Sequence, residues 1–355
     1  MRFNDGIQVE EVEACSICHA AGVPRHPGMR DKIFGAAGVW NLSYCRACDL
    51  GWLNPRPVPS DIGKAYRNYY THSISQERRS ILSALKRSVQ SELLNRRFGY
   101  QTVPAATASR LVATVASTLV PMATEVVGFS VMWLAACWKG KLLDVGCGTG
   151  EFLEKMKQLG WDVAGVEPDE QAAGVAKERF GLDVSATTLA EARFSSNSFD
   201  CITAHQTIEH MHDPIEFLGE SLRILKPGGK LIVTTPNISS LGHRVFRRCW
   251  RGLEPPRHLF LFSPRALRTC VDRVGFQIEV LRTSARSTWE IWYASRLICR
   301  DGKIPSTFPE NLDSGLRLEG LAIQLLQHML LRFNETIGEQ IVMIASKPLR
   351  PVSVA

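Results

Sequence analysis

Short apolar runs alternate with amphipathic segments along the chain from Lys141 onward. The run KLLDV at 141–145 has the length of a buried strand, and a glycine-rich turn and the amphipathic stretch EFLEKMKQLG follow it. The run DVAGVEP then starts the pattern again. Repeated units of strand and helix produce a parallel sheet covered by helices on both faces. The pattern predicts the α/β fold class, with a doubly wound, mostly parallel sheet of seven strands.

Capping residues and later apolar runs place the remaining elements of this region. Helices are expected at 169–180 and 214–225, with KPGG ending the second one, and a helical insertion is expected at about 289–334. Ser263 followed by Pro264 predicts another helix start, and Gly275 predicts its end. The other five strands are predicted at 183–186, FDCITAH (199–205), KLIVTTP (230–236), FQIEVLR (276–282) and QIVMIAS (340–346).

The first 138 residues differ in composition from the α/β region. Residues 1–60 carry two pairs of cysteines and end in NPRPVPS, whose prolines prevent regular structure. Residues 61–138 combine a basic helical stretch with an apolar one. We therefore expect a small cysteine-bearing module at 1–60, a helical linker at 61–138, and an α/β domain at 139–355.

The stretch from Leu111 to Trp138 is apolar apart from Glu125, and Pro121 interrupts it. It is long enough to span a bilayer, but a charge near the bilayer centre costs at least about 2.5 kcal/mol. A kinked pair of short helices is therefore the preferred interpretation. Three roles stay open for this stretch: burial or a homodimer face, contact with a membrane surface, and a membrane span.

Composition and charge narrow the environment and the partners. The chain has 355 residues, 45% of them apolar, and its formal net charge of +7 favours a partner with negative charge, such as a nucleotide, a phosphorylated lipid or an anionic membrane. The arginines are scattered rather than collected in a block, which argues against nucleic acid. The opening residues lack a signal-peptide pattern, so the ten cysteines indicate a reducing, cytoplasmic location, with the inner membrane surface as an alternative.

A glycine-rich turn after the first strand of the α/β region is the strongest signal for function. LLDVGCGTG places Asp144 at the end of an apolar strand and glycines at 146, 148 and 150. Glycines let the backbone turn sharply and approach a ligand, while the following helix presents free N–H groups. The spacing lacks the third glycine position of dinucleotide-binding dehydrogenases. In these residues the sequence resembles the class I methyltransferases, which implies S-adenosylmethionine as cofactor.

The resemblance also implies which residues bind the cofactor. In the family, an acidic residue after the second strand accepts hydrogen bonds from the ribose hydroxyls, and Glu167 stands at that place. Thr188 lies where many relatives have an aspartate that reaches the adenine, and His205 lies at the cofactor edge of the fourth strand. The expected cofactor-binding residues are Asp144, Gly146, Cys147, Gly148, Gly150, Glu167, Thr188 and His205.

Two CxxC pairs, Cys15 with Cys18 and Cys45 with Cys48, are separated by 26 residues. Four thiolates in two such pairs suit one tetrahedral structural zinc ion, with a redox pair or coincidental cysteines as the alternative. Zinc would stabilise a segment too short to build a sufficient core alone. The order CxxC, CxxC, NPRP and methyltransferase core resembles a bacterial group with an N-terminal zinc ribbon. That group includes sugar C-methyltransferases and methyltransferases of polysaccharide pathways.

The similarity to this group implies methyl transfer to a sugar, nucleotide-linked or lipid-linked, in polysaccharide biosynthesis. O-methylation of a quinone or another isoprenoid-like acceptor is the alternative among enzymes. The alternative of another class is a chain that binds the cofactor or a partner without turnover, and the intact Asp144 and Glu167 argue against it. Because fold-level analogy does not identify a substrate, the acceptor stays open.

Two clusters are candidates for catalysis. PPRHLFLFS holds His258 where the sugar C-methyltransferases have a histidine base, and Arg257 beside it could hold a phosphate or carboxylate. A structural role stays open for both. QTIEHMHD holds Glu209 and His210, similar to a pair that can bind a divalent metal in ubiquinone-pathway O-methyltransferases, although Gln206 replaces an acidic residue here. Joining the strand to the next helix is the structural alternative for this pair.

Overall fold

The structure is a computed structural model, which describes residues 2–67, 81–101, 121–304 and 312–349. The chain divides into two compact units. The first unit, here called the acceptor unit, contains Met1–Tyr70, Gln206–Leu222 and Val233–Ala355. The second, here called the glycine-turn unit, contains Thr71–His205 and Arg223–Ile232.

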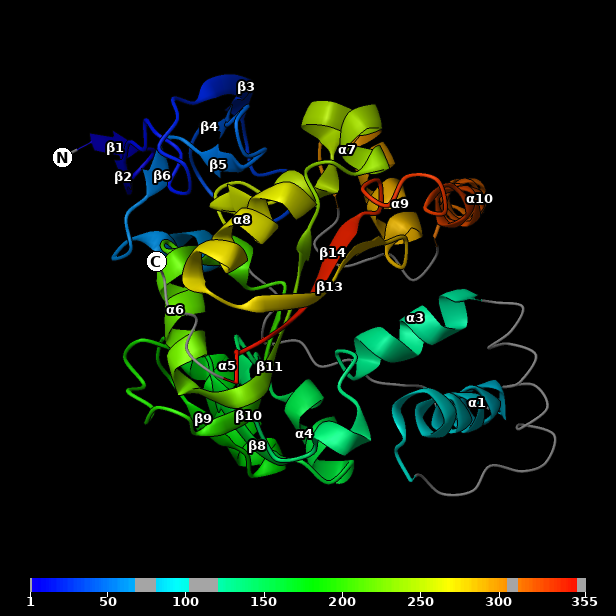
Figure 1. The fold of residues 1–355 in the computed structure, drawn as a ribbon. Coiled ribbons are helices and arrows are strands. Elements are labelled where there is room, and N and C mark those ends of the chain that lie inside the picture. Colours follow the sequence, from blue (N-terminus) through cyan, green and yellow to red (C-terminus); the bar gives the residue numbers. More distant parts are fainter. Residues whose placement is uncertain (1, 68–80, 102–120, 305–311, 350–355) are drawn as a thin grey trace. The chain divides into compact units, whose positions relative to one another are not determined.

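The glycine-turn unit holds the predicted repeats of strand and helix (Figure 1). Its elements are α1 (Ile81–Phe98), α3 (Pro121–Ser130), η3 (Ala136–Trp138), β7 (Lys141–Val145), α4 (Glu151–Gln158), β8 (Asp162–Val166), α5 (Glu170–Phe180), β9 (Asp183–Ser185), β10 (Phe199–His205) and the beginning of β11 (Leu225–Pro236). Strand β7 pairs in parallel with β8 on one side and with β10 on the other. Strand β8 pairs in parallel with β9. Four of the five residues of β7 are buried, as expected for a central strand covered on both faces.

Helix α5 shows how local sequence sets the element boundaries in this unit. The Asp169 side chain accepts hydrogen bonds from the amides of Gln171 and Ala172, which caps the helix start, and Gly181 ends the helix at a φ of +59°. Ala173 and Ala176 are fully buried against α4 and the sheet, in one cluster with Leu153 and Val184. Small side chains on this face therefore let α5 pack closely.

The KPGG segment is an exception to the predicted boundaries. We expected it to end the helix before it, but α6 (Pro214–Ile224) stops earlier and β11 already begins at Leu225. Lys226 forms an ion pair with Asp200, with 2.8 Å between its Nζ and a carboxylate oxygen, and Gly228 adopts a φ of +79°. The glycine therefore accommodates an irregularity inside the strand rather than the end of a helix.

The acceptor unit combines the N-terminal segment with the later part of the chain. Its elements are β1 (Arg2–Asn4), β2 (Ile7–Glu10), β3 (Val23–Met29), β4 (Trp40–Tyr44), β5 (Gly51–Leu53), β6 (Arg56–Pro57), η1 (Ile62–Tyr66), η4 (Ile208–His210), most of α6, the end of β11, α7 (Leu241–Phe246), η5 (Arg247–Cys249), η6 (Arg251–Leu253), β12 (Phe260–Leu261), α8 (Pro264–Val274), β13 (Gln277–Ser284), α9 (Thr288–Asp301), α10 (Ser314–Leu330) and β14 (Gln340–Ser346). Helices α9 and α10 lie side by side (Figure 1). They occupy the predicted insertion.

Two sheets in the acceptor unit involve the N-terminal segment. One has the order β1-β2-β6, and the other has the order β12-β5-β4-β3. Strand β12 pairs antiparallel with β5, with Phe260 opposite Trp52. The N-terminal cysteine-bearing segment thus shares a sheet with residues that lie far along the chain. Helix α8 begins as predicted, because the Ser263 hydroxyl accepts a hydrogen bond from the amide of Ala266.

The predicted seven-stranded sheet is confirmed, with the order β13-β14-β11-β10-β7-β8-β9. Strand β13 is antiparallel to β14, which accounts for the mixed character of the sheet. Within the glycine-turn unit, the chain runs outward from β7 through β8 to β9 and then returns to place β10 on the other side of β7. Ligands of doubly wound sheets bind at the carboxyl ends of the strands where the order reverses. The glycine-rich turn follows β7, at this point.

The predicted apolar stretch is described only from Pro121 onward, and residues 111–120 lie outside the described residues. Pro121 is the first residue of α3, where a proline does not interrupt helical hydrogen bonds. Within the parts of the chain that the structure describes, no helix is long and apolar enough to cross a membrane.

Gly150 provides a test of the packing around the turn. It has a φ of +81°, and a Cβ added there would lie 2.6 Å from Leu182 Cδ1 and 2.9 Å from Ala176 Cβ. We expect Gly150→Ala to lower the free energy of unfolding by about 1–3 kcal/mol, because it combines backbone strain with overpacking. The matched control is Gly174→Ala inside α5, where an added Cβ meets nothing within 4 Å. The control should stabilise by about 0.5–1 kcal/mol in urea titrations, and equal effects of the two variants would contradict this packing.

Candidate functional site

The glycine-rich turn is built by three glycines in left-handed backbone conformations. Gly146, Gly148 and Gly150 have φ angles of +73°, +54° and +81°. The amide of Gly146 donates to the carbonyl of Val166, over 2.8 Å, which fixes the turn to the end of β8. A Cβ added at Gly148 would meet nothing within 4 Å, so this part of the turn is open. Helix α4 starts directly after Gly150, and its first amides have no partner within the helix.

Two carboxylates lie beside the turn, as the sequence predicted. Asp144 is the penultimate residue of β7 and is almost fully buried, and its Oδ1 accepts a hydrogen bond from the Thr203 hydroxyl over 2.6 Å. Burial, with a smaller contribution from the nearby Glu167, raises the pKa of Asp144 to about 7, although the hydrogen bond from Thr203 opposes this shift. Glu167 accepts hydrogen bonds from the amides of Gly148 and Asp169, over 2.9 and 3.0 Å. Glu167 therefore holds the turn against the start of α5, and burial raises its pKa as well.

The other cofactor-binding candidates differ in their surroundings. Cys147 is buried, and burial raises the pKa of its thiol, so it packs rather than reacts. Thr188 donates its hydroxyl hydrogen to Glu191 over 2.7 Å. His205 is exposed at the end of β10, in an edge contact with Phe129. The sequence did not single out Thr203, whose only signal is a hydroxyl residue within the apolar run FDCITAH.

In the acceptor unit, Glu209 is a fully buried carboxylate in η4. Its Oε2 accepts a hydrogen bond from the Thr235 hydroxyl over 2.8 Å. Among the described residues, its Oε1 has no hydrogen-bond partner. Burial raises the pKa of Glu209 to about 8. Burying a polar oxygen without a hydrogen-bond partner costs free energy of folding, so we expect this atom to bind a ligand.

Two histidines lie beside Glu209 with their orientation fixed by backbone carbonyls. His210 Nδ1 lies 3.0 Å from the carbonyl oxygen of Arg257, and His258 Nδ1 lies 2.8 Å from that of Gly252. A carbonyl oxygen only accepts hydrogen bonds, so each Nδ1 carries the proton and each Nε2 has the lone pair. The Tyr66 hydroxyl lies 3.0 Å from His210 Nδ1 and accepts from the same N–H, and His258 Nε2 lies 3.8 Å from a Glu254 carboxylate oxygen. Burial lowers the pKa of both imidazoles, that of His258 to about 3, so both are neutral near pH 7.

The three side chains form one cluster, here called the Glu-His-His cluster: Glu209, His210 and His258. One carboxylate oxygen and one ring nitrogen from each histidine all lie within 4.8 Å of one another. The two segments are joined by a backbone hydrogen bond, in which the Leu259 amide donates to the Glu209 carbonyl over 2.8 Å. Two neutral imidazoles and a carboxylate are ligands typical of divalent transition metals. Donation of the other ring nitrogen to a backbone carbonyl is the usual support of a metal-binding histidine.

The sequence named the members of this cluster in two separate motifs, and the structure brings them together. The neighbouring His212 and Asp213 lie outside it. His212 Nε2 is 2.9 Å from the carbonyl of Pro57, and Asp213 accepts hydrogen bonds from the first amides of α6.

Arg257 has a structural environment. Its side chain is fully buried, and its guanidinium donates to Glu254 over 3.0 Å and to Asp31 over 2.9 Å. It also donates to the carbonyl of Ala65. We expected Arg257 to hold a phosphate or carboxylate of a ligand. In the structure, the carboxylates that it binds belong to the protein itself. Burial opposes ionisation of Glu254, but the guanidinium groups of Arg251 and Arg257 hold its pKa below the usual range, so it stays ionised.

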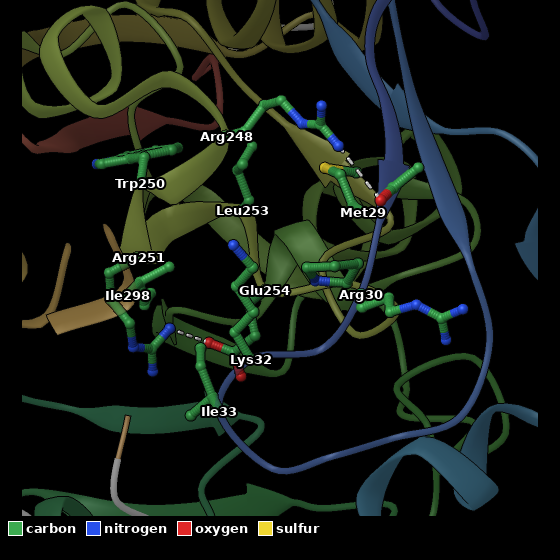
Figure 2. A pocket seen from close by; sticks show the side chains of 12 residues that line it. Met29, Arg30, Lys32, Ile33, Arg248, Trp250, Arg251, Leu253, Glu254 and Ile298 are labelled. Atoms are coloured by element: carbon green, nitrogen blue, oxygen red, sulfur yellow. Dashed lines mark hydrogen bonds and ion pairs between the residues drawn. The ribbon is translucent and has the colours of Figure 1, made fainter. Parts of the chain in front are cut away.

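Glu254 also contributes to the lining of a small pocket (Figure 2). Four cationic residues contribute to its lining: Arg30, Lys32, Arg248 and Arg251. Figure 2 shows Arg251 directed toward Glu254, with which it forms an ion pair, and Arg248 directed toward the chain at residues 28 and 29. The cavity of about 120 Å³ is too small to enclose a drug-sized ligand. Its charge can attract a small anion, but it is not an acceptor site by itself.

The four N-terminal cysteines also come together. Their Sγ atoms all lie within 4.8 Å of one another. The Sγ atoms of Cys15 and Cys48 are 3.4 Å apart, as are those of Cys18 and Cys45, and those of Cys18 and Cys48 are 3.7 Å apart. Each pair lies on a tight turn, in which the amide four residues after the first cysteine donates to its carbonyl. The two turns face each other, so the four thiols can bind one metal ion.

Comparison with known proteins identifies the class. Residues 94–281, more than half of the chain, match the family described as a methyltransferase domain. The chain belongs to this family, the class I S-adenosylmethionine-dependent methyltransferases. Solved structures of S-adenosylmethionine-dependent methyltransferases also align with it. One from Archaeoglobus fulgidus is 19% identical, covers 67% of this chain and 93% of its own, and has a TM-score of 0.40.

Curated relatives carry a more specific name. A ubiquinone biosynthesis O-methyltransferase of Ruegeria pomeroyi is 34% identical over 38% of this chain and 62% of its own length. The human mitochondrial ubiquinone biosynthesis O-methyltransferase is 33% identical over 40% of this chain and 42% of its own length. The chain thus spans less than two thirds of these relatives. Their name overturns our expectation of a sugar acceptor in polysaccharide biosynthesis, which was wrong.

The raised pKa of Asp144 predicts how folding stability depends on pH. The folded protein keeps this carboxyl protonated up to a pKa of about 7, whereas an unfolded chain loses the proton near pH 4. The stabilisation is therefore full below about pH 4 and is lost as pH rises through 7, by up to about 4 kcal/mol. Asp144→Asn should remove this slope. We expect the difference in unfolding free energy between variant and native chain to grow from pH 4 to 7 without cofactor; a constant difference would contradict the burial.

Proposed function

We propose that this chain transfers a methyl group from S-adenosylmethionine to a hydroxyl oxygen of a quinone-type or other isoprenoid-like acceptor. The observation that carries the proposal is the Glu-His-His cluster, a buried donor set suited to a divalent cation. The names of the curated relatives support the same class of acceptor. Family membership supports the cofactor.

The residues of the glycine-turn unit account for cofactor binding. S-Adenosylmethionine supplies an electrophilic methyl group on a sulfonium. The turn at Gly146 to Gly150 leaves open space at Gly148, where an added Cβ would meet nothing within 4 Å, and Glu167 offers carboxylate oxygens for a vicinal diol. Each Glu167 oxygen accepts one backbone amide and has a second lone pair that a ribose hydroxyl can use, and each such charge-assisted bond contributes roughly 1.5–3 kcal/mol. Asp144 supports the turn, because the hydrogen bond from Thr203 fixes its buried carboxyl group in place.

The Glu-His-His cluster fits a divalent cation by three features. Glu209 has a buried oxygen without a hydrogen-bond partner in the described structure, and both histidines are neutral. Their Nε2 lone pairs are available because each Nδ1 donates to a carbonyl. A bound divalent cation would lower the pKa of an acceptor hydroxyl and so favour the oxygen nucleophile. Glu209, His210 and His258 are thus assigned to holding the ion, and the protein excludes water around them.

At the N-terminus, we propose a structural zinc ion bound by Cys15, Cys18, Cys45 and Cys48. A tetrahedral zinc–thiolate site has Zn–S distances of about 2.3 Å, which corresponds to S–S separations of about 3.8 Å. The closest separations here, 3.4 to 3.7 Å, are near that value. The proposed role is to hold the two turns together next to β4 and β5.

Removal of Glu209 tests the O-methyltransferase proposal. Glu209→Gln keeps an oxygen that can accept from Thr235, and it mimics the protonated carboxyl, so the variant should fold with unchanged stability. We expect at least about tenfold weaker Mn²⁺ binding in calorimetry and a similar loss of methyl transfer to a catechol with an isoprenoid tail. The control is Glu216→Gln on the exposed side of α6, which should behave as the native chain. Full activity of Glu209→Gln in the presence of a chelator would contradict the metal assignment.

The zinc proposal is tested by Cys45→Ser. Loss of one thiolate ligand should remove close to one zinc ion per chain from protein purified from cells, measured by elemental mass spectrometry, and lower the thermal unfolding midpoint. Cys137→Ser, at an exposed cysteine outside the cluster, is the matched control and should retain zinc. Equal metal content in the two variants would show that the four cysteines do not bind the ion.

A further inference from the structure

Helix α10 presents an apolar face to the outside. Leu318, Leu325, Met329 and Phe333 at its carboxyl end are 68%, 58%, 57% and 89% exposed. Further exposed apolar residues on the helix are Leu321, Leu326 and Leu330. Their spacing of three and four residues aligns most of them on one side of the helix, over a length of about 25 Å. A contiguous exposed apolar surface of this kind marks an interaction site.

The orientation of α10 is fixed by polar side chains on the opposite face. Gln324 is buried and donates from Nε2 to the carbonyl of Arg286 over 2.7 Å. Gln327 is buried and donates from Nε2 to the carbonyl of Ile337 over 2.5 Å and to Glu339 over 3.1 Å. These bonds would be lost if the helix turned its leucines inward. The glutamines therefore hold the apolar face outward.

Positive charge accompanies this face along one side. Arg317 lies on one margin of the stripe, near the Trp289 ring, and Arg332 follows just past the end of α10 on the same side. The acidic residue Glu319 lies at the other margin, where it is bound to Arg296 and Trp292. The stripe thus has leucines at its centre and cations at one edge, the distribution of a helix that lies in the surface of an anionic bilayer.

A second copy of the chain is a poorer fit than a bilayer. In a two-fold antiparallel pairing of α10 about Leu325, the margin with the cations would face the same margin of the copy. Arg317 would then approach the copy's equivalent of Arg332, and the one acidic residue within Ser314–Leu330, Glu319, lies on the other margin. On an anionic bilayer, lipid phosphates would offset the charges of these two arginines.

We propose that α10 is a membrane-surface helix. It lies parallel to an anionic bilayer, with Leu318, Leu325 and Phe333 among the upper acyl chains and with Arg317 and Arg332 against lipid phosphates. This contact does not depend on the proposed methyl transfer, so the two proposals can fail separately.

The test is cosedimentation of the full chain with vesicles of phosphatidylcholine alone or mixed with phosphatidylglycerol. We expect binding to the mixed vesicles that weakens with salt.

The double variant Leu318→Glu/Leu325→Glu should lower the partition coefficient by at least about tenfold, because it places two charges in the apolar region. Arg317→Gln/Arg332→Gln should weaken binding less and flatten its salt dependence. Affinity for S-adenosylmethionine should stay unchanged in all these variants, which shows that they are folded.

The matched control is Phe3→Glu, a single exposed apolar residue on β1. It should bind vesicles as the native chain does. Native protein that stays in the supernatant with the mixed vesicles would overturn the proposal, as would an equal loss in the Phe3 variant. If analytical ultracentrifugation instead finds a dimer that the Leu318/Leu325 variant dissociates, without vesicle binding, a second copy covers the stripe and the membrane proposal is wrong.

Discussion

The acceptor unit depends on one buried ion-pair network, centred on Arg257. This fully buried guanidinium is held by Glu254 and Asp31, and a buried charge is tolerated only when it is paired in this way. Glu254 belongs to the same short loop as the carbonyls of Gly252 and Arg257, which orient His258 and His210. Asp31 and the Ala65 carbonyl come from the N-terminal segment. The network therefore joins that segment to the loop, and the loop fixes the two histidines.

The two units use buried carboxylates for different purposes. One Asp144 oxygen accepts from the Thr203 hydroxyl and both Glu167 oxygens accept from backbone amides, so both carboxyl groups support the glycine-rich turn. Glu209 keeps one oxygen without a hydrogen-bond partner in the described structure, next to two neutral imidazoles. Each Glu167 oxygen is held by one amide and can accept a further hydrogen bond, whereas a buried oxygen with no hydrogen bond, as in Glu209, is poised for a cation. This contrast separates the cofactor-binding chemistry from the acceptor chemistry.

Local sequence predicted the fold because its signals are local. Apolar runs, the Asp169 and Ser263 caps, and the glycines after helices placed the strands and helices of the sheet within a few residues. The helix end predicted at KPGG was wrong, because the glycine lies at an irregularity within a strand. The sequence predicted the members of the Glu-His-His cluster only in two separate motifs. It could not show that these distant segments meet, which they do through the backbone hydrogen bond between Leu259 and Glu209. The sugar acceptor was inferred from the resemblance of the order CxxC, CxxC, NPRP and methyltransferase core to a bacterial group, but acceptor choice depends on loops without such a signal.

The most direct test of the account is anomalous diffraction from crystals grown with Mn²⁺ and S-adenosylhomocysteine. The account predicts one manganese peak bonded to a Glu209 oxygen and to the Nε2 atoms of His210 and His258. It also predicts the cofactor product on the turn at Gly146 to Gly150. A manganese ion bound elsewhere, with the Glu209 oxygen still unligated, would contradict the role assigned to this cluster.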